Sequence, residues 1–132
     1  MAGTLEVHVV TPEREVWVGE ASIVIARASD GDVGILPGHA PMVAALAVGP
    51  LFLDVDGRRV AAAVDGGFIH VVDAGERTRV DVLAENAELA DELDSGSARP
   101  FQERASELRG EDRYDEARTE QAKADTRQRL SS

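Results

Sequence analysis

Apolar and polar residues alternate along most of the first 84 positions of the chain. In "TLEVHVV", Leu5, Val7 and Val9 fall on one side of an extended segment, while Glu6 and His8 fall on the other. This period of two is typical of a strand that is buried on one face. Similar short runs follow, and turn sequences separate them at intervals of about ten residues. The pattern predicts a mainly β sandwich of short antiparallel strands, without room for the crossover helices of a parallel α/β fold.

Turn residues indicate where several of these strands end. "DG" stands between alternating runs in "LFLDVDGRRVAAAV", which is the strongest local signal of a two-strand hairpin. "DAGERT" is expected to form a second hairpin turn in "GGFIHVVDAGERTRVDVLA". "GILP" is too short for a helix, and Pro37 is expected to end its pairing because proline has no N–H to donate.

The character of the sequence changes after Leu83. The stretch "AENAELADELD" is rich in Ala, Glu and Leu, which favour a helix. "SGSARP" interrupts it, because glycine destabilises a helix and Pro100 fits only a first turn. The next segment, "FQERASELRG", places apolar residues on one helical face and ends in a suitable terminator; these residues are Phe101, Ala105, Leu108 and Gly110.

The last predicted helix, "EDRYDEARTEQAKADTRQRLSS", is polar over most of its surface. Its best stripe consists of Tyr114, Ala117, Gln121 and Ala124. An isolated helix with so few apolar residues is marginal in water, so the tail is expected to depend on a partner or to move. The predicted organisation is a β-sandwich domain over residues 1–85 and a helical C-terminal domain over residues 86–132.

Composition and charge narrow the classes of function. The chain has no cysteine, which excludes disulfides, thiolate zinc sites and a cysteine nucleophile. Its net charge of -11 argues against binding of nucleic acid, whose phosphates attract clustered Lys and Arg. The acidic excess lies in residues 1–94, with 17 acids against 6 bases, while residues 95–132 carry 8 of each. No apolar run is long enough to span a bilayer, and the first residues do not resemble a secretion signal. We therefore expect a cytosolic chain that meets a membrane only through a partner.

Candidate chemistry is concentrated in "GDVGILPGHAPMV", where three glycines and two prolines surround His39. His8, His39 and His70 are far apart in the sequence, and no metal site is predicted. A general base at His39 would need a carboxylate or a nucleophile beside it, and Asp30 and Asp32 are the candidates. The other interpretations are a histidine that hydrogen-bonds its own turn and a rigid loop that docks to a partner with little loss of entropy.

These residues carry a resemblance to a known family. "GDVGILPGHAPMVAALAVGPLFL", followed by "VDGGFIHVVDAGERTRVDVLAENA", is similar to the epsilon subunit of the bacterial F-type ATP synthase. The resemblance is strong over residues 4–86 and loose in the tail. It implies a non-catalytic rotor subunit of the central stalk, which couples proton translocation through the membrane sector to ATP synthesis from ADP and phosphate. Such a subunit is peripheral, at the cytoplasmic face of the bacterial cell membrane.

The resemblance also implies partners. The sandwich is expected to bind the gamma subunit and the ring of c subunits through a docking loop that contains Asp30, Gly31, Asp32, Gly38 and His39. The tail is expected either to fold on the sandwich or to extend along gamma to the alpha and beta subunits, where family tails inhibit ATP hydrolysis. The bases that would meet acidic surfaces there are Arg104, Arg109, Arg113, Arg118 and Arg129.

Several family members bind ATP at the tail through an I/L-D-x-x-R-A motif. The corresponding stretch here is "LDSGSA", in which Leu93, Asp94 and Ala98 match while Ser97 replaces the arginine. Gly96 also weakens a helix at this point. Because a cation for the phosphates is missing, weak or absent ATP binding is predicted, and no cofactor is expected.

Two other functions stay open from the residues alone. A free-standing β-sandwich module for a sugar or a peptide would need a groove lined by aromatic side chains, yet the chain has only five aromatic residues, which are scattered. A small enzyme would use His39 with Asp30 or Asp32. Replacing His39 with alanine separates these functions, because an enzyme would lose turnover while a rotor subunit would lose at most coupling or assembly.

Overall fold

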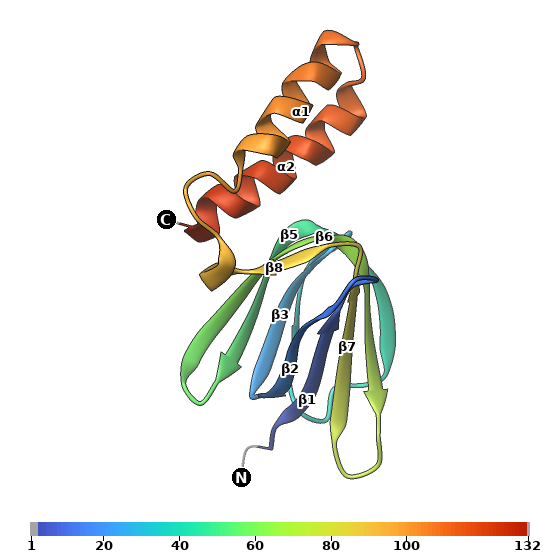
Figure 1. The fold of residues 1–132 in the computed structure, drawn as a ribbon. Helices are drawn as coiled ribbons and strands as arrows, with labels where there is room; N and C mark the ends of the chain where they lie inside the picture. Colours follow the sequence, from blue (N-terminus) through green and yellow to red (C-terminus); the bar gives the residue numbers. More distant parts are fainter. Residues whose placement is uncertain (1–2, 132) are drawn as a thin grey trace.

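The computed structural model describes residues 3–131, in which eight strands precede the helices (Figure 1). The strands are β1 (Leu5–Val10), β2 (Glu15–Ala21), β3 (Ile23–Ala28), β4 (Gly31–Ile35), β5 (Met42–Val55), β6 (Arg58–Asp73), β7 (Thr78–Ala84) and β8 (Ala87–Leu89). A short 3-10 helix, η1 (Ala90–Glu92), leads to α1 (Arg99–Gly110) and α2 (Tyr114–Ser131). The predicted fold class, a β-sandwich followed by two C-terminal helices, is confirmed.

The strands form one sheet that folds over on itself into two layers (Figure 1). Their order is β2-β1-β7-β6-β5-β3-β4, and β8 pairs with β6 off this path. β5 and β6, with 14 and 16 residues, pair along nearly their whole length. The first part of β6 also pairs with β8, and its second part, from Gly67 onward, pairs with β7. These two long strands therefore connect the layers.

Two glycines allow β6 to pass from one layer to the other. Gly66 and Gly67 have φ angles of +90° and +128°, a region that favours glycine. A Cβ atom on Gly67 would lie 2.1 Å from the carbonyl oxygen of Leu83 in β7. Only glycine therefore lets the two strands approach this closely, which is the structural reason for the "GGF" sequence.

β1 lies between β2 and β7 and runs differently relative to each. It pairs antiparallel with β2, whereas its pairing with β7 is parallel, with Leu5 opposite Thr78 and Val10 opposite Leu83. The hairpin signals in the sequence indicate antiparallel neighbours only, because they report on strands that are adjacent in the chain. The rest of the sandwich supplies the long connection that a parallel pair requires.

Aliphatic side chains fill the space between the layers. Leu5, Val7 and Val9 of β1 are at most 1% exposed, as their alternation predicted. They pack with inward-facing residues of the other strands, including Val24, Ile35, Leu51, Leu53, Ile69, Val71, Val80 and Val82. Within residues 3–131, the buried members of this core all come from strands and none from a helix. The sandwich thus has a core of its own.

The tail is a helical hairpin that stands at one end of the sandwich (Figure 1). The buried apolar residues among its described positions are small apart from one leucine; they are Ala98, Ala105, Leu108, Ala117 and Ala124. Four of these were predicted to face inward. Tyr114 was predicted to join them but is 55% exposed, because it begins α2 and donates its hydroxyl to Asp112 at 2.8 Å.

The stretch between sandwich and helices is not the helix that its composition favours. Residues 87–89 form β8, which pairs with β6, and residues 90–92 form only η1. Hydrogen bonds to an existing strand outweigh the helix propensity of Ala, Glu and Leu here. Arg14 adds an ion pair to Glu92 at 2.9 Å. β8 lies beyond residue 85, and the division of the chain into domains 1–85 and 86–132 stays a prediction.

Candidate functional site

The loop between β4 and β5 holds His39 with its own backbone. The His39 N–H donates to the Leu36 carbonyl at 3.0 Å, and the Nδ1–H of the ring donates to the Ala40 carbonyl at 2.7 Å. The Gly38 N–H donates to the Thr78 hydroxyl at 2.8 Å, which ties the loop to β7. The loop is therefore restrained. His39 hydrogen-bonds its own turn, which was one of the interpretations that the sequence left open.

Asp30, Gly31 and Asp32 lie at the opposite end of β4 from His39. This strand has five residues and spans about 13 Å. Gly31 adopts a φ of +125°, and Asp32 accepts a hydrogen bond from the Arg27 Nε–H at 3.3 Å. The predicted docking residues thus fall into two groups at different ends of the sandwich, and the arrangement gives His39 no carboxylate partner from this turn. Among the residues that the structure describes, no group of three or more His, Asp or Glu side chains is arranged to hold a metal ion.

One surface of the sandwich exposes apolar side chains. We call this surface the outer face, and its apolar members, which are between 44% and 66% exposed, are Val18, Val43, Phe68 and Leu83. They lie on β2, β5, β6 and β7, and Phe68 is directly opposite Leu83 in the β6–β7 pairing. Apolar side chains that gather on an exposed surface often mark a contact with another protein.

A shallow depression lies beside Phe68 and Leu83. It has a volume of about 370 Å³, and Val10 and Pro12 contribute to its walls. The next cross-strand pair of β6 and β7, His70 and Asp81, is polar. His70 is opposite Val43, and Asp81 is opposite His8, the neighbour of Val18, so polar side chains lie between the two valines of the outer face. Protein–protein contacts commonly combine apolar and polar side chains in this way.

The "LDSGSA" stretch forms a turn before α1. The Asp94 carboxylate accepts from the Gly96 N–H at 2.8 Å and from the Ser97 hydroxyl at 3.4 Å. The Asp94 N–H donates to the Ser97 hydroxyl at 2.9 Å. Leu93 is half-buried, and Ala98 is buried as the N-cap of α1. The Asp94 carboxylate and the Ser97 hydroxyl are therefore engaged in their own turn, and the absence of ATP binding at this stretch stays a prediction.

The tail bases predicted from the sequence are exposed, and Arg129 lies near the end of α2. Arg104 pairs with Glu107, Arg113 with Glu111 and Glu116, and Arg118 with Asp115, while Arg109 donates to Gln121. Exposed ion pairs contribute at most about 1 kcal/mol. These bases can therefore exchange their neighbours for acidic groups of a partner at little cost.

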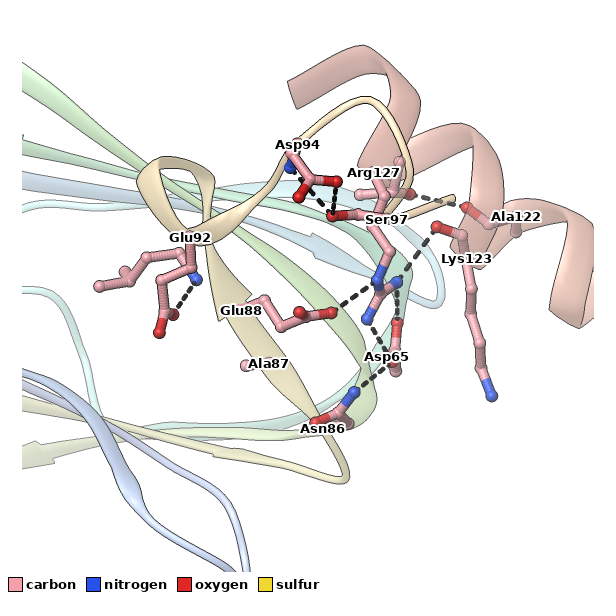
Figure 2. Close-up of polar contacts among 12 residues, drawn as sticks. Asp65, Asn86, Ala87, Glu88, Glu92, Asp94, Ser97, Ala122, Lys123 and Arg127 are labelled. Atoms are coloured by element: carbon pink, nitrogen blue, oxygen red, sulfur yellow. Dashed lines mark hydrogen bonds and ion pairs between the residues drawn. The ribbon is translucent and has the colours of Figure 1, made fainter. Parts of the chain in front are cut away.

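The most deeply buried polar cluster was not predicted from the sequence (Figure 2). Arg127 of α2 is 0% exposed, and its two terminal nitrogens donate to the Asp65 carboxylate of β6 at 2.8 and 2.7 Å. Its Nε–H donates to Glu88 of β8 at 2.8 Å, and one terminal nitrogen also donates to the Lys123 carbonyl at 3.1 Å. The Asn86 side chain donates to the same Asp65 carboxylate at 3.0 Å. Three elements of the chain thus meet at one guanidinium.

Phe101 of α1 also contacts this guanidinium. Its ring centroid lies 4.2 Å from the central carbon of the Arg127 guanidinium, a cation–π distance. Burial opposes the charge of Arg127, but hydrogen bonds to Asp65 and Glu88 outweigh burial and raise its pKa. Two weak signals of this cluster exist in the sequence. Arg127 follows the buried Ala124 by three residues, and Asp65 interrupts the apolar run "AAAVDGG".

Comparisons with known proteins agree on one family. Residues 4–90, which end just after β8, match the family described as "ATP synthase, Delta/Epsilon chain, beta-sandwich domain". The chain is 46% identical over 106 residues to the ATP synthase epsilon chain of Streptomyces avermitilis, and this alignment covers 80% of the chain and 82% of the relative. It is 42% identical over 107 residues to that of Desulforamulus reducens, with coverage of 81% and 78%.

A similar fold occurs in a solved assembly, the OSCP/F1/c-ring of the Euglena gracilis mitochondrial ATP synthase in rotational state 1. The TM-score is 0.76 at 21% identity, over 93% of this chain and 78% of the compared chain. At this identity the likeness concerns the fold. Neither described helix is both long and apolar enough to cross a membrane.

Proposed function

The chain belongs to the family of ATP synthase epsilon chains, non-catalytic central-stalk subunits of the F-type enzyme, and we propose that it transmits rotation within that complex. Rotation driven by proton translocation would pass through it to the catalytic alpha and beta subunits, which make ATP from ADP and phosphate. Its partners alone would hold it at the cytoplasmic face of the bacterial membrane. The observation that carries this proposal is the family match over the whole sandwich, combined with an exposed apolar face.

The outer face is the surface that we propose for the gamma subunit. Burying a Phe or Leu completely contributes about 1.5–3 kcal/mol. Phe68 and Leu83 are 54% and 48% exposed, so covering this pair would contribute about 2 kcal/mol. The restrained loop that contains Gly38 and His39 leads into β5, the strand of Val43. We therefore place this loop in the same contact.

The turn of Asp30, Gly31 and Asp32 is the proposed contact with the ring of c subunits. It is exposed and acidic, and it lies at the other end of β4 from the loop of His39. Since the chain has no native cysteine, single cysteines can test both contacts in the assembled complex. Asp32→Cys should crosslink to a c subunit and His39→Cys to gamma. The opposite pattern would reverse the orientation that we propose for the sandwich.

The tail is proposed to inhibit ATP hydrolysis when it leaves the sandwich and reaches the alpha and beta subunits. Its described helices bury only one large apolar side chain, Leu108, so its own packing holds it weakly. Its exposed bases are bound by pairs that break at little cost. A switch requires two states within a few kcal/mol of each other, and this thin packing meets that requirement.

The test is ATP hydrolysis by a catalytic sector stripped of this subunit, to which the full chain or residues 1–92 are added back. The shorter chain keeps β8, η1 and the entire core of the sandwich. Both forms should bind gamma, and only the full chain should lower the rate. Equal rates with both forms bound would remove the inhibitory role and leave a mechanical one. Failure of both forms to bind gamma would contradict the proposal as a whole.

A further inference from the structure

The contact between the helical hairpin and the sandwich depends on few side chains. Four residues of α2 are buried: Ala117, Ala124, Thr126 and Arg127. The two alanines offer only a methyl group each, and the Thr126 hydroxyl donates to the Ala122 carbonyl of its own helix. Arg127 is different, because its bonds cross from α2 to β6 and β8.

Both charges of the central ion pair are removed from water. The Arg127 side chain is 0% exposed and that of Asp65 is 4% exposed, while Glu88 keeps 35% of its side chain in solvent. Four N–H groups of Arg127 find acceptors: two on the Asp65 carboxylate, one on Glu88 and one on the Lys123 carbonyl. Removing one partner of such a buried pair leaves the other charge without compensation, which strongly disfavours the closed arrangement.

The sandwich holds the receiving carboxylate in place. The Asp65 N–H donates to the Asn86 carbonyl at 2.9 Å, and the Asn86 side chain donates back to the Asp65 carboxylate at 3.0 Å. These bonds belong to β6 and the connection between β7 and β8. They do not involve the tail, so the acceptor is formed before a helix arrives.

Phe101 connects α1 to the Arg127 guanidinium as well. It lies on α1, and its ring stacks on the Arg127 guanidinium of α2. The contact forms only when the two helices lie side by side. The hairpin should therefore dock and leave as a unit.

We propose that Arg127, Asp65 and Glu88 form a latch that holds the helical hairpin on the sandwich, and that the latch closes without a nucleotide. Opening exposes both charges to water, and closing requires the guanidinium to find two carboxylates in one geometry. The latch itself is independent of the proposed inhibition. Its effect on ATP hydrolysis rests on the proposed function.

The position of the tail can be measured directly, because introduced cysteines would be the only ones in the chain. Spin labels at Glu13→Cys and Ser106→Cys, both at exposed positions, report the distance between the sandwich and α1 in the isolated full chain. Without nucleotide, the parent should give one main distance. Arg127→Met should raise the population at other distances at least tenfold. Arg99→Gln, which removes an exposed guanidinium of α1, is the matched control and should leave the distribution unchanged.

Two further measurements separate the latch from general unfolding. Trp17, the single tryptophan, lies in β2 and reports on the sandwich, so its fluorescence should not change in the Arg127→Met variant. Asp65→Asn should open the tail as Arg127→Met does, and the double variant should open it no further than either single variant. Additive opening in the double variant, or an unchanged distance in Arg127→Met, would overturn the latch.

ATP hydrolysis by the stripped catalytic sector then tests the consequence for activity. If the tail inhibits when released, Arg127→Met should inhibit more strongly than the parent chain, while Arg99→Gln should match the parent. Opening of the tail without stronger inhibition would support the latch and contradict the inhibitory role. An unopened tail would contradict the latch, whatever the rate of hydrolysis.

Discussion

Gly67 permits the close approach of β6 and β7, and replacing it with alanine tests how much the sandwich depends on that approach. Two separate costs are expected. A non-glycine residue at a φ of +128° is strained by about 1–3 kcal/mol. In addition, the new Cβ would lie 2.1 Å from the Leu83 carbonyl oxygen, so the β7 backbone must move, and relief of such overpacking costs about 1–3 kcal/mol.

Together these costs predict a loss of about 4 kcal/mol from a free energy of unfolding that is about 5–15 kcal/mol in domains of this size. Urea unfolding followed by Trp17 fluorescence measures this loss. Two glycines provide graded controls. Gly57→Ala has a positive φ of +79° but open space around its Cβ, so it should lose about 1 kcal/mol. Gly34→Ala has neither problem and should change stability by less than about 0.5 kcal/mol.

The reasoning is refuted if Gly67→Ala unfolds within about 0.5 kcal/mol of the parent chain, since the strain and the steric contact would then have been absorbed cheaply. A loss equal to that of Gly57→Ala would have a narrower meaning. It would show that the backbone conformation matters at Gly67 and that the approach of β7 does not.

Three other outcomes follow from the same contacts. Leu83→Asp should weaken binding to gamma at least tenfold in a pull-down titration, while the control Thr119→Asp, on the tail, should bind as the parent does. Unchanged binding by Leu83→Asp would show that the outer face does not contact gamma. Hydrogen bonds from Arg14 and then from the Leu89 N–H lower the pKa of Glu92 from 4.5 in the folded chain. The ionised Glu92 therefore stabilises the fold above pH 4.5, and this stabilisation disappears as the pH falls through the lowered pKa. The parent should therefore have a higher free energy of unfolding than Glu92→Gln at pH 7, and the difference should vanish well below pH 4.5. A difference that persists in acid would show that the ionisation of Glu92 is not its cause. Calorimetry of the full chain with ATP should show no saturation at micromolar concentration, and saturation there would contradict the interpretation of Ser97.

Local patterns in the sequence were sufficient for most of the strands and helical faces, but not for β8, where they favoured a helix. The alternation in β1 identifies its buried side because the period of two fixes which residues share a face. Pro37 marks the end of β4 because it cannot donate to a neighbouring strand. These inferences need only residues that are close together in the chain.

The features that join distant segments could not be predicted in the same way. Nothing in "TLEVHVV" indicates a parallel partner in β7, and nothing in α2 indicates that Arg127 meets Asp65. The docking residues show the same limit. Asp32 and His39 are seven positions apart in the sequence, yet β4 between them is extended and carries them to different ends of the sandwich.

The parallel pairing of β1 with β7 also shapes how the chain acquires its structure during synthesis. The first strand leaves the ribosome early, but Leu5 has no parallel neighbour until Thr78 has been made. Contacts this far apart in sequence slow folding, because a long loop must close before they form. One edge of β1 therefore stays open while most of the domain is being synthesised. The helices emerge after the sheet can close, so Arg127 meets an Asp65 that is already fixed in a finished strand.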